Sequence, residues 1–251
     1  MPDLLAFFRE LSAAARAVTL GAPVPAADNK AGEGSYDPVT EIDRAAERAL
    51  RTVIESRFPD DGIEGEEYGL VRPEARRRWV IDPVDGTRAL ICGLPSWTTL
   101  VALFENGEPV AGMIDAPVLD ELAVGLPDHA RLNGTAMRTS GCAVLAEARL
   151  STTDPFILGE GATRFERVRQ SVRVTRFGLD ALAYARLAAG HLDLVIENGL
   201  QRYDWGALVP VVRGAGGVVG NWQGGSDLSG GDLVAAATPA LFEQAIATLN
   251  R

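Results

Sequence analysis

The sequence contains little of what several large classes of protein require. Its 251 residues include two cysteines and two histidines, so neither a disulfide framework nor a cysteine–histidine metal site is indicated. No apolar run approaches the roughly 18–20 residues of a membrane-spanning helix. The early charges at Asp3, Arg9 and Glu10 are not typical of a signal peptide. We therefore expect a cytoplasmic protein with no membrane partner.

Basic side chains are also scarce. Lysine and arginine total 24 against 34 aspartates and glutamates, which gives a net charge of −10 at pH 7. Nucleic-acid partners require basic faces, so none is expected here. If the substrate is itself an anion, the local field must be reversed, and bound divalent cations are the usual means.

Apolar periodicity predicts the elements of the first half of the chain. Residues 3–20 are expected to form an amphipathic helix, and residues 21–36, rich in Pro, Gly and Ala, a loop. A second helix should begin at Thr40, where Thr40 and Asp43 form a capping-box pattern, and end at Phe58. Strands are predicted at 78–81, 98–104, 109–114 and 121–126, the middle two as a hairpin.

After about residue 145 predicted strands and helices alternate. The strands are expected at 149–152, 172–177, 192–197, 217–221 and 233–237, and the helices at 164–171, 180–189, 205–213 and 239–249. This change of pattern predicts a mixed α/β fold of two subdomains, 1–145 and 146–251, with their boundary inside 140–148. A functional site is expected where the two halves meet.

The segment "WVIDPVDGTRAL" (79–90) places two aspartates directly after an apolar strand. Pro83 fixes its own φ and favours an extended Asp82, so Asp82 is expected to end the strand. The carboxylates of Asp82 and Asp85 and the carbonyl of Val84 can converge as hard oxygen ligands for Mg²⁺. A simple turn could use the same residue types, and this alternative stays open.

The same segment continues into a predicted helix. Asp85 falls at its N-cap position, and Gly86 and Thr87 follow as its first residues. Exposed N–H groups at a helix start bind phosphate. A cation site beside such a helix start is typical of a metal-dependent phosphate enzyme.

Three further acidic positions stand at breaks between elements. Asp43 lies in the first turn of the second helix, Glu66 and Glu67 lie in the glycine-bracketed "GIEGEEYG", and Asp204 precedes the predicted helix 205–213. Each has a plain structural alternative. An aspartate at a helix start is most often a cap, and two glutamates in a glycine turn usually form a solvated loop.

Four segments in order resemble the inositol monophosphatase superfamily of Mg²⁺-dependent, lithium-sensitive phosphomonoesterases. They are "DPVTEID" (37–43), "GEE" (65–67), "DPVDGT" (82–87) and "YDWGALVPVVRGAGG" (203–217), and the resemblance spans nearly the whole chain. "DPVDGTRALICGLPSW" and "GMIDAPVLDE" look like the histidinol-phosphate phosphatase branch. The resemblance implies a layered αβαβα sandwich, a homodimer, and a small-molecule phosphate ester as partner.

The resemblance also implies a set of metal ligands. Glu66, Asp82 and the Val84 carbonyl would hold a first Mg²⁺, and Asp82, Asp85 and Asp204 a second. A third, weaker position would use Glu66 with water, so two or three ions are expected per site.

Catalytic and phosphate-binding roles follow from the same resemblance. Gly86 and Thr87 would bind the phosphate through their N–H groups. Thr87 and Asp43 would orient the attacking water, with Glu66 beside them as the third catalytic residue.

The substrate prediction is hydrolysis of L-histidinol phosphate in histidine biosynthesis. Glu197 matches a family carboxylate that contacts the leaving alcohol, and Asp180 and Arg88 are further candidates for substrate binding. Three departures from the branch, at Leu179, Leu90 and segment 122–130, leave other substrates open. The alternatives are inositol monophosphate, a sugar or nucleotide bisphosphate, or a metal-binding regulator that has lost turnover.

Overall fold

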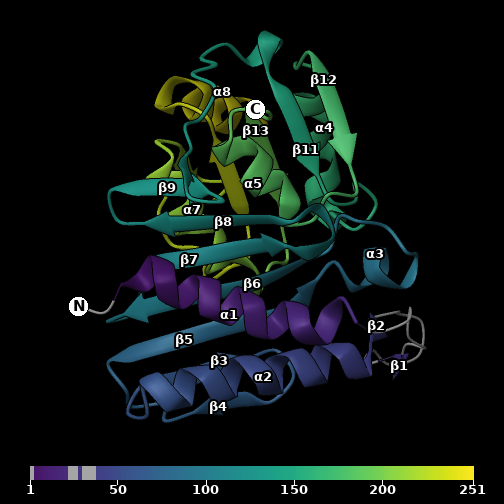
Figure 1. Cartoon of the computed structure of the whole chain (residues 1–251). Coiled ribbons are helices and arrows are strands. Elements are labelled where there is room, and N and C mark those ends of the chain that lie inside the picture. The colour runs from purple at the N-terminus through teal and green to yellow at the C-terminus, as the bar shows by residue number, and fades with distance from the viewer. Residues whose placement is uncertain (1–2, 22–27, 30–37) are drawn as a thin grey trace.

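The computed structural model describes residues 3–21, 28–29 and 38–251. Most of the loop predicted at 21–36 lies outside the described residues. The rest of the chain forms an eight-stranded sheet, a five-stranded sheet and helices that cover and separate them (Figure 1). A two-stranded ribbon, β1 (Asp28–Asn29) with β2 (Pro38–Val39), adds to them. None of the described helices is long and apolar enough to cross a membrane.

The two N-terminal helices form as their sequences predict. Helix α1 spans Leu4–Thr19, and the carboxylate of Asp3 accepts a hydrogen bond from the Ala6 N–H at its start. Helix α2 spans Glu41–Arg57 and begins with the predicted capping box between Thr40 and Asp43. Both predictions are confirmed. The helices lie together on one face of the larger sheet (Figure 1).

The larger sheet contains the predicted hairpin and has the strand order β10-β9-β8-β7-β6-β5-β3-β4. Its strands are β3 (Gly62–Gly65), β4 (Gly69–Val71), β5 (Arg77–Asp85), β6 (Thr98–Glu105), β7 (Glu108–Ala116), β8 (Glu121–Leu126), β9 (His129–Leu132) and β10 (Thr135–Ala136). All neighbours are antiparallel except β3 and β5. The 3₁₀ turn η1 (Pro117–Leu119) joins β7 to β8.

The smaller sheet has the order β12-β11-β13-β15-β14, with β11 parallel to both of its neighbours. Its strands are β11 (Arg149–Thr152), β12 (Val174–Phe177), β13 (Leu194–Glu197), β14 (Val218–Gly220) and β15 (Leu233–Ala236). The remaining helices are α3 (Thr87–Ile91), α4 (Ala162–Arg169), α5 (Leu182–Ala188), α6 (Arg202–Trp205), α7 (Leu208–Gly214) and α8 (Pro239–Leu249), with 3₁₀ turns η2 (Leu145–Glu147) and η3 (Gly159–Gly161).

The layers follow the expected αβαβα order. Helices α1 and α2 pack on the outside of the larger sheet, α5 and α7 fill the space between the sheets, and α4 and α8 cover the smaller sheet (Figure 1). Gly112 and Gly125 pair across β7 and β8, and both meet the backbone of α7 where a side chain would collide with it. The middle layer can therefore lie close to the sheet.

Residues 137–148 separate the two sheets in sequence. The predicted division between 145 and 146 falls in this segment. We propose that 1–145 and 146–251 are two subdomains that complete one site between them, while α7, from the second half, packs on the first sheet.

Candidate active site

The two aspartates of the "DPVD" segment lie in a bulge of strand β5. Asp82 pairs with Leu100 and Asp85 with Thr98, so β5 has one more residue than β6 over this interval. The Pro83 carbonyl accepts a hydrogen bond of 2.8 Å from the Thr99 hydroxyl. The prediction that Asp82 ends the strand is therefore wrong, because the bulge lets β5 continue to Asp85 while it redirects both carboxylates.

Helix α3 begins one residue later than predicted. Gly86, not Asp85, is its N-cap, with φ of 80°. A side chain at Gly86 would come within 3.0 Å of the Asp180 carboxylate, so both the backbone angle and the close approach require glycine. The N–H groups of Gly86 and Thr87 precede the first helical bond, from Ala89 N–H to Gly86 O at 2.8 Å.

Asp43 reaches this point from helix α2. Its carboxylate is buried and closes the capping box on Thr40. Its other oxygen lies 3.3 Å from the hydroxyl of Thr87, which also lies 3.1 Å from the Val84 carbonyl. Asp43 is thus both a helix cap and a neighbour of the site, so the two readings of this residue do not exclude each other.

Glu66 is positioned by a residue that the sequence analysis missed. The fully buried Glu47 of α2 accepts hydrogen bonds from the N–H of Glu67 at 2.7 Å and from Arg51 at 2.7 Å. Gly65 leaves room for the Glu47 carboxylate. A glutamate on the apolar face of a predicted helix, one residue after Ala46 and three before Leu50, was the signal that could have revealed it. Glu66 follows strand β3 directly.

Asp204 lies inside the short helix α6, not before a helix at 205–213 as predicted. Its carboxylate accepts from the Gln201 N–H at 2.6 Å in a second capping box. Gly206 separates α6 from α7, and a side chain there would collide with the Arg202 carbonyl. The Trp205 ring rests on Phe104 of the larger sheet, at 5.7 Å between centroids, which fixes the position of α6.

Glu197 stands at the end of strand β13 in the second half of the chain. Its carboxylate is buried and accepts from the Thr153 N–H at 2.8 Å, the Thr153 hydroxyl at 3.0 Å and the Thr152 hydroxyl at 3.3 Å. Burial raises the pKa of Glu197 to about 8 in spite of these donors. Asp180 precedes α5 with φ of 47°, and burial raises the pKa of Asp180 to about 6 while Arg88 opposes the shift.

These side chains surround one cavity of about 300 Å³. Nearly all of the residues predicted to form the site line it: Glu66, Asp82, Val84, Asp85, Gly86, Thr87, Arg88, Asp180, Glu197 and Asp204. Asp43 lies behind Thr87. Thr153, Ile157 and 198–200 complete the lining. The cavity lies where the two halves of the chain meet, as expected.

The charges in this cavity are one-sided. Its lining holds six carboxylates against the single guanidinium of Arg88. Burial raises the pKa of Asp82 well above its usual range, and the charges of Glu66, Asp85 and Asp204 raise it further. The pKa of Asp85 is raised in the same way, by burial and then by its acidic neighbours. These carboxylates therefore lie close enough to repel one another.

The chain's similarity to known proteins agrees with this geometry. The model of the inositol monophosphatase family matches residues 3–251. The chain belongs to the inositol monophosphatase family. It is 41% identical over 226 residues to the chloroplastic bifunctional phosphatase IMPL2 of Arabidopsis thaliana, an alignment covering 85% of this chain and 65% of the plant protein. It is 33% identical over 222 residues to a histidinol-phosphatase of Mycobacterium tuberculosis, covering 85% of each.

The fold is shared with solved structures of the family. An inositol monophosphatase from Zymomonas mobilis aligns with a TM-score of 0.87 and 39% identity, over 99% of this chain and 98% of the other. The mixed α/β fold predicted from the sequence is confirmed. The protein is therefore an inositol monophosphatase-family phosphatase, and members of the family act on small phosphate esters.

Proteins of this family generally use Mg²⁺, and the donors in this member fit a hard cation. They are carboxylate oxygens and the Val84 carbonyl. Among the residues that the structure describes, no three acidic, histidine or cysteine side chains already stand at the spacing of a metal site. Asp82, Asp85 and Asp204 each accept from a backbone N–H instead, for example Asp82 from the Val84 N–H at 3.0 Å. The residue types fit Mg²⁺.

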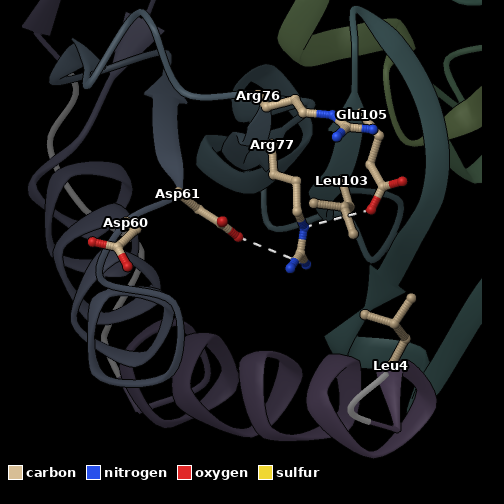
Figure 2. Close-up of a pocket in the computed structure, with 7 residues that line it drawn as sticks. All are labelled: Leu4, Asp60, Asp61, Arg76, Arg77, Leu103 and Glu105. Atoms are coloured by element: carbon tan, nitrogen blue, oxygen red, sulfur yellow. Dashed lines mark ion pairs between the residues drawn. The ribbon is translucent and has the colours of Figure 1, made fainter.

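This phosphatase has a larger cavity, of about 460 Å³, at the opposite end of β5 (Figure 2). Arg77 lies between Asp61 and Glu105 there, at 3.7 and 3.5 Å, and its guanidinium covers the Phe58 ring at 5.0 Å. Its described lining holds three carboxylates and two guanidiniums, so this cavity lacks the one-sided charge of the smaller one. Cavity size alone does not identify the site.

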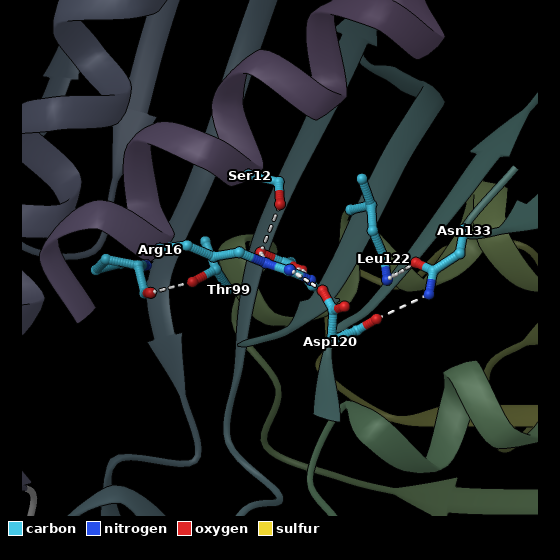
Figure 3. A network of polar contacts seen from close by, with 8 residues as sticks. Ser12, Arg16, Thr99, Asp120, Leu122 and Asn133 are labelled. Atoms are coloured by element: carbon cyan, nitrogen blue, oxygen red, sulfur yellow. Dashed lines mark hydrogen bonds and ion pairs between the residues drawn. The ribbon is translucent and has the colours of Figure 1, made fainter. Parts of the chain in front are cut away.

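A second polar network joins helix α1 to the larger sheet (Figure 3). The buried Asp115 of β7 accepts from Arg16 of α1 at 2.7, 3.0 and 3.1 Å and from Ser12 at 2.9 Å. Asp115 is the cross-strand partner of Thr99, whose hydroxyl bonds the Pro83 carbonyl. The outer helix α1 is thus fixed to the strands that carry the site.

Proposed function

We propose that the protein is a Mg²⁺-dependent phosphomonoesterase whose substrate is L-histidinol phosphate. The observation that carries the proposal is the cavity of about 300 Å³, lined by six carboxylates beside the start of α3. An anionic ester cannot approach such a surface unless cations are bound to it. The similarity to a histidinol-phosphatase and to a bifunctional phosphatase supports the choice of ester.

Glu66, Asp82, Asp85, Asp204 and the Val84 carbonyl are the residues that would hold Mg²⁺. All five line the cavity, and their oxygen atoms are the ligands that Mg²⁺ prefers. When bound, Mg²⁺ supplies positive charge for the phosphoryl oxygens and lowers the pKa of a water molecule. Two or three ions per site are proposed.

The chain's own groups then orient the reactants. The N–H groups of Gly86 and Thr87, which precede the first bond of α3, would bind a phosphoryl oxygen. The Thr87 hydroxyl lies between the Asp43 carboxylate and the Val84 carbonyl, at 3.3 and 3.1 Å. It can accept a hydrogen bond from the attacking water while it donates to Asp43, so that Asp43 would receive the proton. Glu66, which lines the same cavity, is proposed as the third catalytic residue.

The leaving alcohol would lie against the wall formed by Glu197 and Asp180. Histidinol carries an amine and an imidazole, and carboxylates are suitable acceptors for both groups. Three hydrogen bonds from Thr152 and Thr153 fix the Glu197 carboxylate at the cavity. Arg88, which lowers the pKa of Asp180 by its charge, keeps that second carboxylate available in its ionised form.

A second candidate substrate is inositol monophosphate. The observation that favours it is the 39% identity to the inositol monophosphatase from Zymomonas mobilis over nearly all of both chains. Its hydroxyl groups could also donate to Glu197 and Asp180. The two substrates differ in charge, since only histidinol phosphate brings cationic groups to this acidic wall.

Phosphate release from three esters tests the proposal. Purified protein would be assayed with L-histidinol phosphate, inositol monophosphate and p-nitrophenyl phosphate, with Mg²⁺ and after chelation. We expect the highest kcat/KM for histidinol phosphate and no turnover after chelation. Full activity in the chelated sample would refute the metal mechanism. A preference for inositol monophosphate would refute the substrate and leave the family assignment intact.

Glu197→Gln tests whether Glu197 contacts the leaving alcohol or supports the part of the site that binds the phosphate. A charge-assisted hydrogen bond contributes roughly 1.5–3 kcal/mol, or about one to two decades in kcat/KM. The variant should lose that factor on histidinol phosphate and keep its rate on p-nitrophenyl phosphate, which has no amine. Glu166→Gln, which alters a carboxylate of α4 that is 42% exposed and does not line the cavity, is the control. Equal losses on both esters would assign Glu197 to support of the fold or of the metal.

We further propose a homodimer, on the resemblance of the sequence to the family. Light scattering at several protein concentrations tests it, and a monomer mass at every concentration would contradict it.

A further inference from the structure

Helix α5 begins just after the cavity residue Asp180. It carries Tyr184, a side chain that the proposed reaction does not use. The Ala181 N–H, just before the helix, donates to Oδ2 of Asp85 at 2.8 Å, so Asp85 lies over its first turn. Tyr184 is three residues after Ala181 and four after the cavity residue Asp180. Tyr184 therefore lies in the first turn of α5, close in the chain to the Ala181 N–H that meets Asp85.

The hydroxyl of Tyr184 is buried without a partner. The side chain is 2% exposed, and its Oη makes no hydrogen bond with any of the described residues. Buried tyrosine hydroxyls normally find a partner, because an unsatisfied one is costly. Burial raises the pKa of Tyr184 well above its usual value, and the charges of Glu197, Asp85 and Asp204 raise it further. A neutral donor thus lies close to three carboxylates.

Asp85 is the carboxylate with an acceptor to spare. Both of its hydrogen bonds within the described chain, from Ala181 and from the Thr98 hydroxyl at 3.1 Å, go to Oδ2. Oδ1 accepts none from the described residues. Glu197, by contrast, already accepts from three donors through both of its oxygens. The described residues thus include an unused donor in the first turn of α5 and an unused acceptor at the end of β5.

We propose that Tyr184 is a positioning residue, whose hydroxyl donates to Asp85 and holds that carboxylate in the orientation that binds Mg²⁺. The inference rests on the proposed function in that Asp85 is taken as a metal ligand. Tyr184 acts through Asp85 and touches neither the ester nor the water. Groups that orient a metal ligand in this way typically change metal affinity about 10–100-fold when they are removed.

Tyr184→Phe removes the hydroxyl and keeps the ring in the core. The matched control is Thr19→Val, which removes another buried hydroxyl that has no partner among the described residues and does not line the cavity. Thermal unfolding of both variants and the wild type would be followed while Mg²⁺ is added to chelated protein. This readout needs no substrate and no turnover.

We expect the metal-free Tyr184→Phe protein to be as stable as the wild type or more stable, since an unpartnered polar atom is removed. The Mg²⁺ concentration that gives half of the stabilisation should rise about tenfold in Tyr184→Phe. It should stay unchanged in Thr19→Val. A merely structural tyrosine would lower the unfolding temperature and leave the Mg²⁺ midpoint in place.

A Mg²⁺ midpoint of Tyr184→Phe within about twofold of the wild type overturns the inference, and the proposed function survives. A wild type that is neither stabilised by Mg²⁺ nor active on phosphate esters overturns both. A wild type that responds to Mg²⁺ beside a variant that responds weakly supports the inference whatever the substrate proves to be.

Discussion

Two groups of buried carboxylates in this protein have opposite surroundings. Asp115 and Asp193 are 0% and 1% exposed, and each is met by an arginine. Asp82 and Glu197 are 2% and 5% exposed, and neither forms an ion pair with any described residue. Burial is the same in both groups, so the difference lies in where the compensating charge comes from.

The paired group is satisfied by the chain itself. Asp193 accepts from the Arg149 Nε at 2.7 Å, its Nη2 at 2.7 Å and its backbone N–H at 2.8 Å, and also from Ser140. Although burial opposes it, these donors lower the pKa of Asp193 below its usual value. Such a site holds two segments of chain together and has no capacity left for a ligand.

The unpaired group is satisfied only in part. Hydrogen bonds from nearby backbone and hydroxyl groups hold Asp82, Asp85 and Glu197 in place, yet the pKa of each stays raised by burial. A buried anion without a cation is unstable unless a positive charge reaches it from outside. The comparison therefore separates carboxylates that build the fold from carboxylates that await a cation, either Mg²⁺ or a group of the substrate.

The largest effect is expected at Asp85, in the unpaired group. Asp85→Asn removes one charged ligand and keeps an oxygen that can still accept from Thr98 and Ala181. The loss of transition-state stabilisation should be several kcal/mol, which is a decrease of about 10³-fold or more in kcat. Steady-state rates at saturating Mg²⁺ measure it, and circular dichroism checks the fold. A near-normal kcat would mean that Asp85 only supports the start of α5, through its hydrogen bond from the Ala181 N–H.

Glu197→Gln should change how stability depends on pH. In the folded protein the pKa of Glu197 is raised from 4.5 to about 8, chiefly by burial. The folded state therefore keeps the proton after the unfolded chain has lost it, and stability falls as pH rises between these two values. Each unit of the shift corresponds to about 1.4 kcal/mol.

Melting curves in a chelating buffer from pH 5 to pH 8.5 test this. Wild type and Glu197→Gln should differ little at pH 5, and the variant should become the more stable protein as pH rises. Other cavity carboxylates give both proteins a common slope, so the difference between the two curves carries the result. Parallel curves would show that the Glu197 carboxylate is not buried as an uncompensated charge.

Asp193→Asn tests the paired group in the same way. The pKa of Asp193 is lowered, so its contribution to stability is present at neutral pH and is lost as pH falls through the acidic range. Because Arg149 is 38% exposed, we expect a cost below the roughly 3–5 kcal/mol of a fully buried pair, about 2 kcal/mol, or roughly 4–8 °C in Tm.

Phosphatase activity should be unchanged in Asp193→Asn when it is measured well below its Tm. A variant that loses activity and keeps its stability would reverse the assignment of this residue. Asp85→Asn and Asp193→Asn should therefore have opposite effects. Asp85→Asn should lose turnover and keep its fold, and Asp193→Asn should lose stability and keep its activity.

The sequence carries most of the fold because local signals define its larger elements. The apolar stripes of α1 and α2, the capping box of α2 and the hairpin of β6 and β7 were predictable from residue types alone. The short strands β3, β4, β9 and β10 were not, since two to four residues show no clear periodicity. The break between α6 and α7 depends on contacts of Gly206 with distant residues.

The sequence predicted which residues form the site, but it did not predict how their side chains are arranged. Motifs named the carboxylates that line the cavity, but the bulge that aims Asp82 and Asp85 arises from pairing between β5 and β6. The supporting residue Thr153 belongs to no local pattern, and the place of Glu47 on an apolar helix face indicates only that it is buried. Their roles appear only when the turn after β3 and the end of β13 are brought to them by the fold.

The smallest effect is expected at an exposed pair that gives a large shift. Arg169, and then Gln170, lower the pKa of Glu166 to about 2 by hydrogen bonding on the surface of α4. Water and salt screen an exposed pair of this kind, so Glu166→Gln should change Tm by no more than about 1 °C. Melting curves at low and high salt measure it. If Glu166→Gln lowered Tm as far as Asp193→Asn does, burial would not be what separates structural carboxylates from surface ones, and the comparison would have to rest on hydrogen-bond number alone.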